Sequence, residues 1–127
     1  MRDIDPSLYK LPPQNIEAEQ AVLGAILLQD KALLKIVELL APDDFYRDAH
    51  KTIFAAMLTL FEKHEPHDLI TVTGLLNDQR KLEEVGGASY LASLTDIIPF
   101  SGTLVHHAQI IRKKSILNGL REYSHFL

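Results

Sequence analysis

The sequence contains no cysteine, so it can form neither a disulfide framework nor a reactive thiolate. It also lacks a long apolar run. The longest, "AVLGAILL" at 21–28, is about eight residues, whereas a membrane-spanning helix needs roughly 20. The first residues, "MRDIDPSLYKLPP", lack the basic and apolar blocks of a signal peptide. These absences favour a cytoplasmic location.

Sequence motifs for nucleotides and metals are also missing. No glycine begins the pattern GxxxxGK[ST], so the chain has no phosphate-binding loop, and Gly86-Gly87 is interpreted as a turn between helices. His64 and His67 flank a proline, while His106 and His107 are adjacent and point in different directions. A zinc site on a helix needs histidines at i and i+4. We therefore expect solvated histidines and no cofactor or metal.

Basic residues are in the minority. The 127 residues include 13 Lys and Arg against 17 Asp and Glu, for a net charge of −4, which argues mildly against a free-standing nucleic-acid binder. The charge is unevenly distributed, because residues 100–127 carry +3 and residues 1–99 carry −7. With 46% hydrophobic residues, the length suits one compact domain with a real core.

Helical spacing of apolar residues dominates what is present, and no stretch shows sustained strand-like alternation. The sequence predicts a compact all-α domain of about six helices, packed orthogonally and ending in a long helix. We expect a flexible N-terminal arm at 1–14, a globular helical domain at 15–99 and a C-terminal helix at 100–127. Helices are predicted at about 15–29, 30–40, 48–65, 68–78, 88–98 and 101–127, with a helical turn at 42–46.

Three side chains are predicted to cap helices. Asn15, Asp30 and Asp68 each precede an apolar helical repeat, where a side-chain oxygen can accept a free backbone N–H. Gly24 lies inside the first helix, which costs about 1 kcal/mol relative to alanine. It belongs to a strip of mostly small residues, so we expect another helix to approach closely there.

The segment "DDFYRDAHKTIFAAM" at 43–57 combines acids, aromatics and a histidine ahead of a strongly apolar helix. One interpretation is a small hydrolase site around Asp48 and His50, but no serine lies nearby, and the adjacent lysine and threonine do not complete a nucleophile arrangement. The other is structural: the acids cap the helix and Phe45 and Tyr46 anchor its entrance. His50 then hydrogen-bonds across the turn. We favour the structural interpretation.

The final helix carries more apolar surface than one stripe. Leu104, Ala108 and Ile111 form one line, which is enough to pack the helix on its own domain. Further apolar residues indicate either a broad core-facing helix or a partner helix, and the candidates for an oligomer interface are Ile110, Ile116, Leu117, Leu120, Tyr123 and Leu127. The run at 112–114 is interpreted as a solvated basic face, with an acidic partner or nucleic acid as the alternative.

Four segments together resemble the N-terminal domain of the bacterial replicative DNA helicase DnaB. "LPPQNIEAEQAVLGAILL", "DDFYRDAHKTIFAAM", "DLITVTGLL" and "GGASYLASL" stand in the same order as in that family. The closing "HHAQIIRKKSILNGL" resembles the start of that domain's C-terminal helical hairpin. The match covers about residues 11–127, and several blocks in register make it specific.

The resemblance implies that the chain is a non-catalytic part of a larger helicase. The family's motor is a RecA-like ATPase domain, absent from this chain, where ATP and Mg²⁺ are expected. The parent protein would be a ring-shaped hexamer that unwinds DNA during replication. Its N-terminal domains form a collar, a trimer of dimers built by pairing the hairpins. The collar docks the C-terminal domain of primase, and a helicase loader also acts on the ring.

Two residues match positions that contact primase in this family, namely Glu17 of "IEAEQ" and Tyr90 of "GGASY". The apolar spacing alone would place Tyr90 in the core, whereas a contact role requires it to be at least partly exposed. His107 stands where relatives often carry a tyrosine, and the second helix of the hairpin is not present. A stand-alone module that binds nucleic acid through Arg112, Lys113 and Lys114 is the alternative function.

Overall fold

The computed structural model describes residues 15–97 and 104–124, and for 121–124 it describes the backbone alone. The arm predicted at 1–14 therefore lies outside the described residues. Within the described ranges the chain forms six α-helices, two short 3₁₀ turns and no strand: α2 (Ile16–Leu28), α3 (Ala32–Ile36), η1 (Pro42–Asp44), α4 (Asp48–Glu62), α5 (Leu69–Asp78), η2 (Glu83–Val85), α6 (Gly87–Leu94) and α7 (Leu104–Ser124). The predicted all-α fold with a long C-terminal helix is confirmed.

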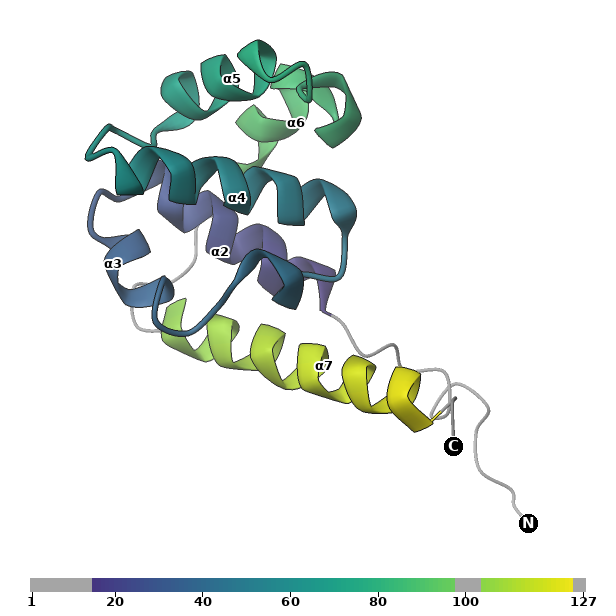
Figure 1. Ribbon diagram of the computed structural model, residues 1–127. Helices are drawn as coiled ribbons and strands as arrows, with labels where there is room; N and C mark the ends of the chain where they lie inside the picture. The colour runs from purple at the N-terminus through teal and green to yellow at the C-terminus, as the bar shows by residue number, and fades with distance from the viewer. Residues whose placement is uncertain (1–14, 98–103, 125–127) are drawn as a thin grey trace.

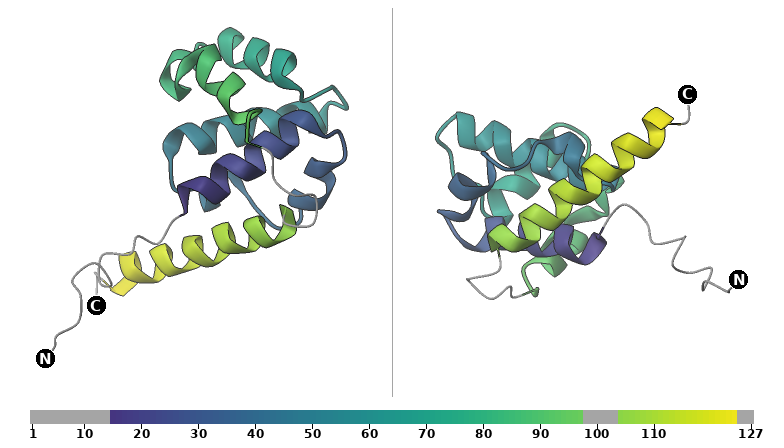
Figure 2. Two further views of the ribbon diagram at one scale, coloured as in Figure 1. Left: turned by 180° about the vertical axis from the view of Figure 1, so that it is seen from behind. Right: turned by 90° about the horizontal axis from the view of Figure 1, so that it is seen from below.

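The helices are arranged in layers (Figure 1). Helices α5 and α6 lie on one side, α4 and α2 form the middle, and α7 crosses the opposite side with α3 near its beginning. Helix α2 contacts α3, α4, α6 and α7, so it is the centre of the domain. The last turns of α7 extend past the rest of the domain, as the view from below also shows (Figure 2).

Helix α2 is buried almost all round because nearly every side chain from Ala18 to Leu27 is apolar or small. A helix that is hydrophobic on all sides is stable only inside a core. Helix α4 supplies the other large contribution, including Ile53, Phe54 and Met57, which are each fully buried. The exposed helices are amphipathic, and α5 buries only Val72 and Leu76.

Gly24 makes the close helix approach that the sequence predicted. A Cβ atom added at this position would collide with the backbone carbonyl of Leu94, at the end of α6. The strip of small residues therefore lets α6 end directly against α2. Leu28, at the far end of the strip, is exposed instead.

Two of the three predicted caps are confirmed. Asn15 accepts the N–H of Ala18 at 3.0 Å, and Asp68 accepts the N–H of Thr71 at 2.9 Å. The prediction for Asp30 is wrong, since α3 begins after Lys31 without a side-chain cap and ends at Ile36. The N–H groups of Leu39 and Leu40 both donate to the carbonyl of Ile36, which tightens the turn that follows α3. The helix predicted at 30–40 is therefore shorter in the structure.

The predicted turn at Gly86-Gly87 is confirmed, because both glycines adopt positive φ angles of 110° and 80°. The turn joins η2 to α6. Because η2 contacts both α4 and α6, the turn lies close to α4.

Candidate functional site

A buried hydrogen-bond network joins three helices. Glu19 on α2 accepts from Nδ1 of His50 on α4 at 2.7 Å, and Nε2 of His50 lies 2.7 Å from the hydroxyl of Tyr90 on α6. A second oxygen of Glu19 accepts the backbone N–H of Tyr46 at 2.7 Å, and Gln20 donates its amide to the Tyr90 hydroxyl at 3.1 Å. His50 and Glu19 are 0% and 1% exposed.

This network corrects the prediction for His50. The sequence interpretation had His50 bonding across the turn of its own helix, whereas both of its ring nitrogens bond to residues at least 31 positions away. Because burial of a charged carboxylate is costly unless it is hydrogen-bonded, Glu19 needs these partners. His50 and the backbone of Tyr46 supply them, and α2, α4 and α6 are thereby joined.

The predicted capping of α4 by acids is also wrong. Arg47 stands at the N-cap of α4 and makes no side-chain cap bond. Asp44 instead accepts the N–H of Ala41 at 2.9 Å and two side-chain bonds from α7, discussed below. Phe45 is buried and anchors the entrance of α4 as predicted, but Tyr46 is half exposed and contributes its backbone N–H.

The network does not have the properties of a hydrolase site. The imidazole of His50 is fully buried, and both of its nitrogens already have partners within the domain. A general base must reach the proton it abstracts within hydrogen-bond distance. Elsewhere in the described ranges, no group of three or more His, Cys, Asp or Glu is placed to hold a metal ion. No helix there is long and apolar enough to cross a membrane.

Tyr90 is the surface end of the network. It is half-buried, which settles the disagreement about its exposure in favour of partial exposure. Its neighbour Gln20 lies three residues after the exposed Glu17, and residues at this spacing share a helix face. The structure thus brings Glu17 and Tyr90 to the same side of the domain, although they are far apart in sequence.

An open cleft of about 360 Å³ adjoins Tyr90. It lies between the beginning of α4 and the glycine turn, and it is lined by Arg47, Asp48, Ala49, Glu84, Val85, Gly86 and Tyr90. Two carboxylates and one guanidinium give this surface a net negative charge. We call the surface formed by Glu17, Tyr90 and this cleft the acidic face.

Helix α7 presents two faces. Leu104, Ala108 and Ile111 are buried against the domain, as the first apolar line predicted. The surplus is exposed: Ile116, Leu117 and Leu120 are 48%, 45% and 60% exposed. Ile110 is half-buried. Of the other two interface candidates, Tyr123 lies in α7 with an undescribed side chain and Leu127 lies outside the described residues.

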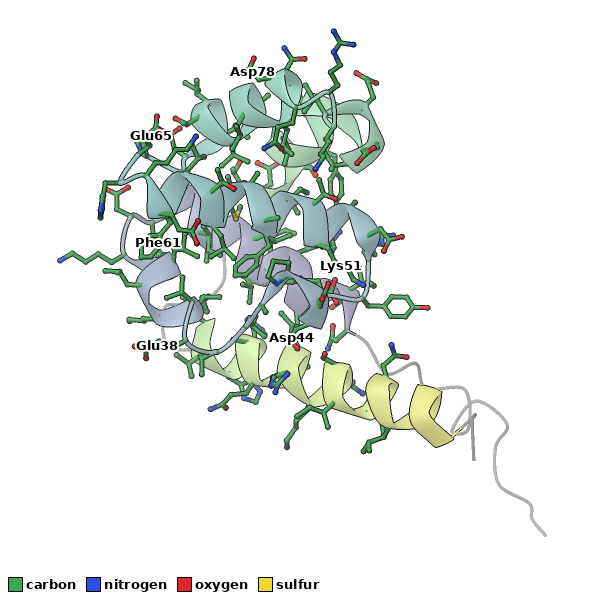
Figure 3. The ribbon with its side chains drawn as sticks, in the orientation of Figure 1. Glu38, Asp44, Lys51, Phe61, Glu65 and Asp78 are labelled. Atoms are coloured by element: carbon green, nitrogen blue, oxygen red, sulfur yellow. The ribbon has the colours of Figure 1, made fainter. Side chains whose placement is uncertain are left out.

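The basic run on α7 is partly neutralised within the domain. Arg112 donates to Asp44 at 2.8 Å, and Ser115 donates its hydroxyl to the same carboxylate oxygen at 2.8 Å. Figure 3 shows Asp44 between η1 and α7. Lys113 is exposed and Lys114 is half-buried. One of the three cations is therefore paired internally.

The remaining histidines are not all solvated as predicted. His67 is 9% exposed, and its ring donates from Nδ1 to the carbonyl of Ile26 at 3.2 Å. This bond connects the segment just before α5 to α2. His64 and His106 are exposed, and His107 is half-buried.

From the sequence, Glu19 is interpreted only as an acid in the first helical turn, and Gln20 is given no role; the buried network of these residues is not predicted. A signal was present, since Glu19 lies among the apolar residues Ala18, Val22 and Leu23 on a helix that is otherwise buried. A carboxylate in such a position needs a partner. His50, a histidine inside the apolar helix α4, is a residue that can supply such a partner.

The described residues form a small all-α domain with a buried polar network, a cleft beside Tyr90 and an exposed apolar stripe on α7. A family model for the DnaB-like helicase N terminal domain matches residues 11–113. The chain belongs to this family, as its sequence motifs predicted.

The relatives are replicative helicases by name. The chain is 53% identical over 111 residues to the replicative DNA helicase DnaC of Bacillus subtilis and 50% identical to DnaB of Geobacillus stearothermophilus. The match covers 87% of this chain and 24% of each relative, so the chain spans about a quarter of their length. The crystal structure of the N-terminal domain of DnaB helicase from Mycobacterium tuberculosis is 38% identical, with a TM-score of 0.86, and the match covers 90% of this chain and 81% of that one.

Proposed function

We propose that the chain is the N-terminal collar domain of a hexameric replicative DNA helicase, which assembles the ring and docks primase and a helicase loader in the cytoplasm. DNA unwinding, with ATP and Mg²⁺, belongs to a separate motor domain. The observation that carries the proposal is the presence of two exposed surfaces, the apolar side of α7 and the acidic face, on a member of this family.

The proposed organisation follows from the same surfaces. An arm at 1–14 precedes the helical domain at 15–99, and the helix at 100–127 begins a hairpin that pairs with a second copy. Three apolar side chains in the C-terminal half of α7 are exposed, and such a patch is typical of protein contacts. Pairing of hairpins would bury it. Three such dimers would then form the collar.

Ring assembly is tested by replacing Ile116 and Leu120 with aspartate in the full-length helicase. Both side chains are exposed in this domain, so the fold should persist while the paired interface is charged and lost. We expect the double variant to dissociate into smaller species, and sedimentation would show this as a lower mass than that of the wild-type hexamer. A hexamer of unchanged stability would show that this stripe serves no assembly role.

Primase docking is tested by calorimetry with the primase C-terminal domain and the hairpin-containing domain. Tyr90→Ala removes an aromatic anchor of the acidic face, and such anchors commonly contribute 2 kcal/mol or more, so affinity should fall by about thirtyfold. Leu34→Ala, an exposed change on α3, is the control. Equal affinities for wild type and Tyr90→Ala would count against docking at this face.

Nucleic-acid binding through α7 is the second candidate, because Lys113 is exposed. It predicts an affinity for DNA that falls steeply with salt and disappears when Arg112, Lys113 and Lys114 are replaced. The internal pairing of Arg112 with Asp44 makes this candidate weaker.

A further inference from the structure

The hydroxyl of Tyr90 has a fixed set of hydrogen-bond partners. A phenol has one proton to donate and lone pairs to accept with. Gln20 donates its amide to the Tyr90 oxygen at 3.1 Å, which occupies one lone pair. The other partner among the described residues is Nε2 of His50, 2.7 Å away. The direction of the Tyr90 proton therefore depends on whether Nε2 accepts or donates.

Glu19 decides between these two arrangements. The carboxylate is an acceptor only, with one oxygen on the N–H of Tyr46 and the other facing Nδ1 of His50 at 2.7 Å. Nδ1 must therefore carry a proton. In the neutral imidazole, Nε2 is then an acceptor, and the Tyr90 hydroxyl donates its hydrogen bond to it, so every donor in the network has a partner. Buried polar groups in native proteins are normally satisfied in this way.

We infer that Glu19 and His50 turn the Tyr90 proton inward, so that Tyr90 offers a lone pair to its docking partner and recognises a lysine or arginine side chain. The inference rests on the proposed docking function. Glu19 and His50 are positioning residues, since both are buried and act through Tyr90. The carboxylates of Asp48 and Glu84, which line the same cleft as Tyr90, favour a cationic donor over a neutral one.

The substitution Glu19→Gln should reverse the network without changing its shape. The N–H of Tyr46 can pair only with the side-chain oxygen of glutamine, which leaves the NH₂ group facing Nδ1 of His50. Nδ1 then becomes an acceptor and the proton moves to Nε2, which donates to Tyr90. With Gln20 and His50 both donating to its oxygen, the Tyr90 hydroxyl must point its proton outward.

The tautomer of His50 is measured first, by long-range nitrogen–proton NMR of the histidine-labelled chain alone at neutral pH. We expect the proton on Nδ1 in wild type and on Nε2 in Glu19→Gln. Glu17→Gln is the matched control, because it removes the same charge from an exposed position two residues away and should leave the tautomer unchanged. A wild-type proton on Nε2, or on both nitrogens, overturns the inference.

Binding of the primase C-terminal domain is measured second. In Glu19→Gln the Tyr90 hydroxyl points its proton at the lysine or arginine donor of the partner. Tyr90→Phe removes the hydroxyl oxygen that accepts from this donor. Each should weaken binding by about tenfold, the usual loss for one hydrogen bond to a charged group. Glu38→Gln, an exposed change of equal charge, should not.

The outcomes separate this inference from the docking proposal. If wild type binds and both variants bind equally well, the hydroxyl is not read by the partner, and the inference fails while docking stands. If wild type does not bind, docking fails and the partner contact fails with it, although the tautomer still decides the proton direction. If Glu19→Gln does not fold, two measurements still test the inference: the tautomer of His50 in wild type and the binding of Tyr90→Phe, whose changed atom is at the surface end of the network.

Discussion

At the scale of single residues, the two glycines inside α2 and α5 occupy opposite surroundings. The position of the missing Cβ at Gly24 is filled by the backbone of α6, whereas nothing lies within 4 Å of the same position at Gly74. Both glycines lower helix propensity by a similar amount. Only at Gly24 is the cost compensated by close packing.

The two glycines predict stability changes of opposite sign. Gly24→Ala should lower the free energy of unfolding by about 1–3 kcal/mol, because α6 must move away from α2. Gly74→Ala should raise it by about 0.5–1 kcal/mol through better helix propensity. Urea unfolding of both variants checks this pair. A neutral or stabilising Gly24→Ala would show that α6 does not end against α2.

Asp68 makes stability depend on pH at the beginning of α5. Hydrogen bonds from the backbone N–H and then the hydroxyl of Thr71 hold the pKa of Asp68 below its usual 3.8. A carboxyl whose pKa is lower in the folded state stabilises fully above its unfolded pKa, and this contribution is lost as the pH falls through the folded value.

Replacing Asp68 with alanine should therefore lower the free energy of unfolding at neutral pH by about 1 kcal/mol, the usual contribution of an N-cap. The difference from wild type should shrink as the pH falls below 3.8. Chemical unfolding at pH 7 and at successively lower pH measures it. A gap that is constant down to the acid limit would contradict the role of the charged form.

At the scale of elements, helix existence followed from the sequence while helix partners did not. The period of apolar residues and the caps Asn15 and Asp68 were sufficient for α2, α4, α5 and α6. The network of Glu19, His50 and Tyr90 was missed because its members are 31 and 40 positions apart. Local spacing contains no information about which distant donor meets which acceptor.

Helix α7 shows what local spacing can and cannot predict. Its line of core-facing residues and its further apolar residues are both evident in the sequence, and the structure shows that the first are buried and that most of the others are exposed. The pairing of Arg112 and Ser115 with Asp44 could not be predicted from the sequence, because the partners are 68 and 71 positions apart and meet only in the folded chain. The same carboxylate had been interpreted as a helix cap.

The two faces of α7 should respond differently to truncation. Ile111→Ala removes a buried side chain and should lower the free energy of unfolding of the domain by about 2–5 kcal/mol. Leu117→Ala removes an exposed one and should change it by less than about 0.5 kcal/mol. Thermal unfolding at a concentration where the domain is monomeric compares them. A large effect at Leu117 would mean that this side packs internally.

At the scale of the whole molecule, the family and the all-α architecture were predictable because several sequence blocks stand in order. The resemblance groups Glu17 and Tyr90 by role, whereas the structure shows how the packing of α2 against α6 brings them to one side of the domain. The domain buries its charged network and leaves its apolar surplus outside. That distribution suits a module that holds other proteins, which is the central claim.

The most direct measurement is an NMR titration of the nitrogen-labelled chain with unlabelled primase C-terminal domain. The account predicts that amide signals shift and broaden around Glu17, Tyr90 and the glycine turn, while those of α3 stay in place. Signals that do not move at saturating partner, or that move only along α3, would contradict docking at the acidic face.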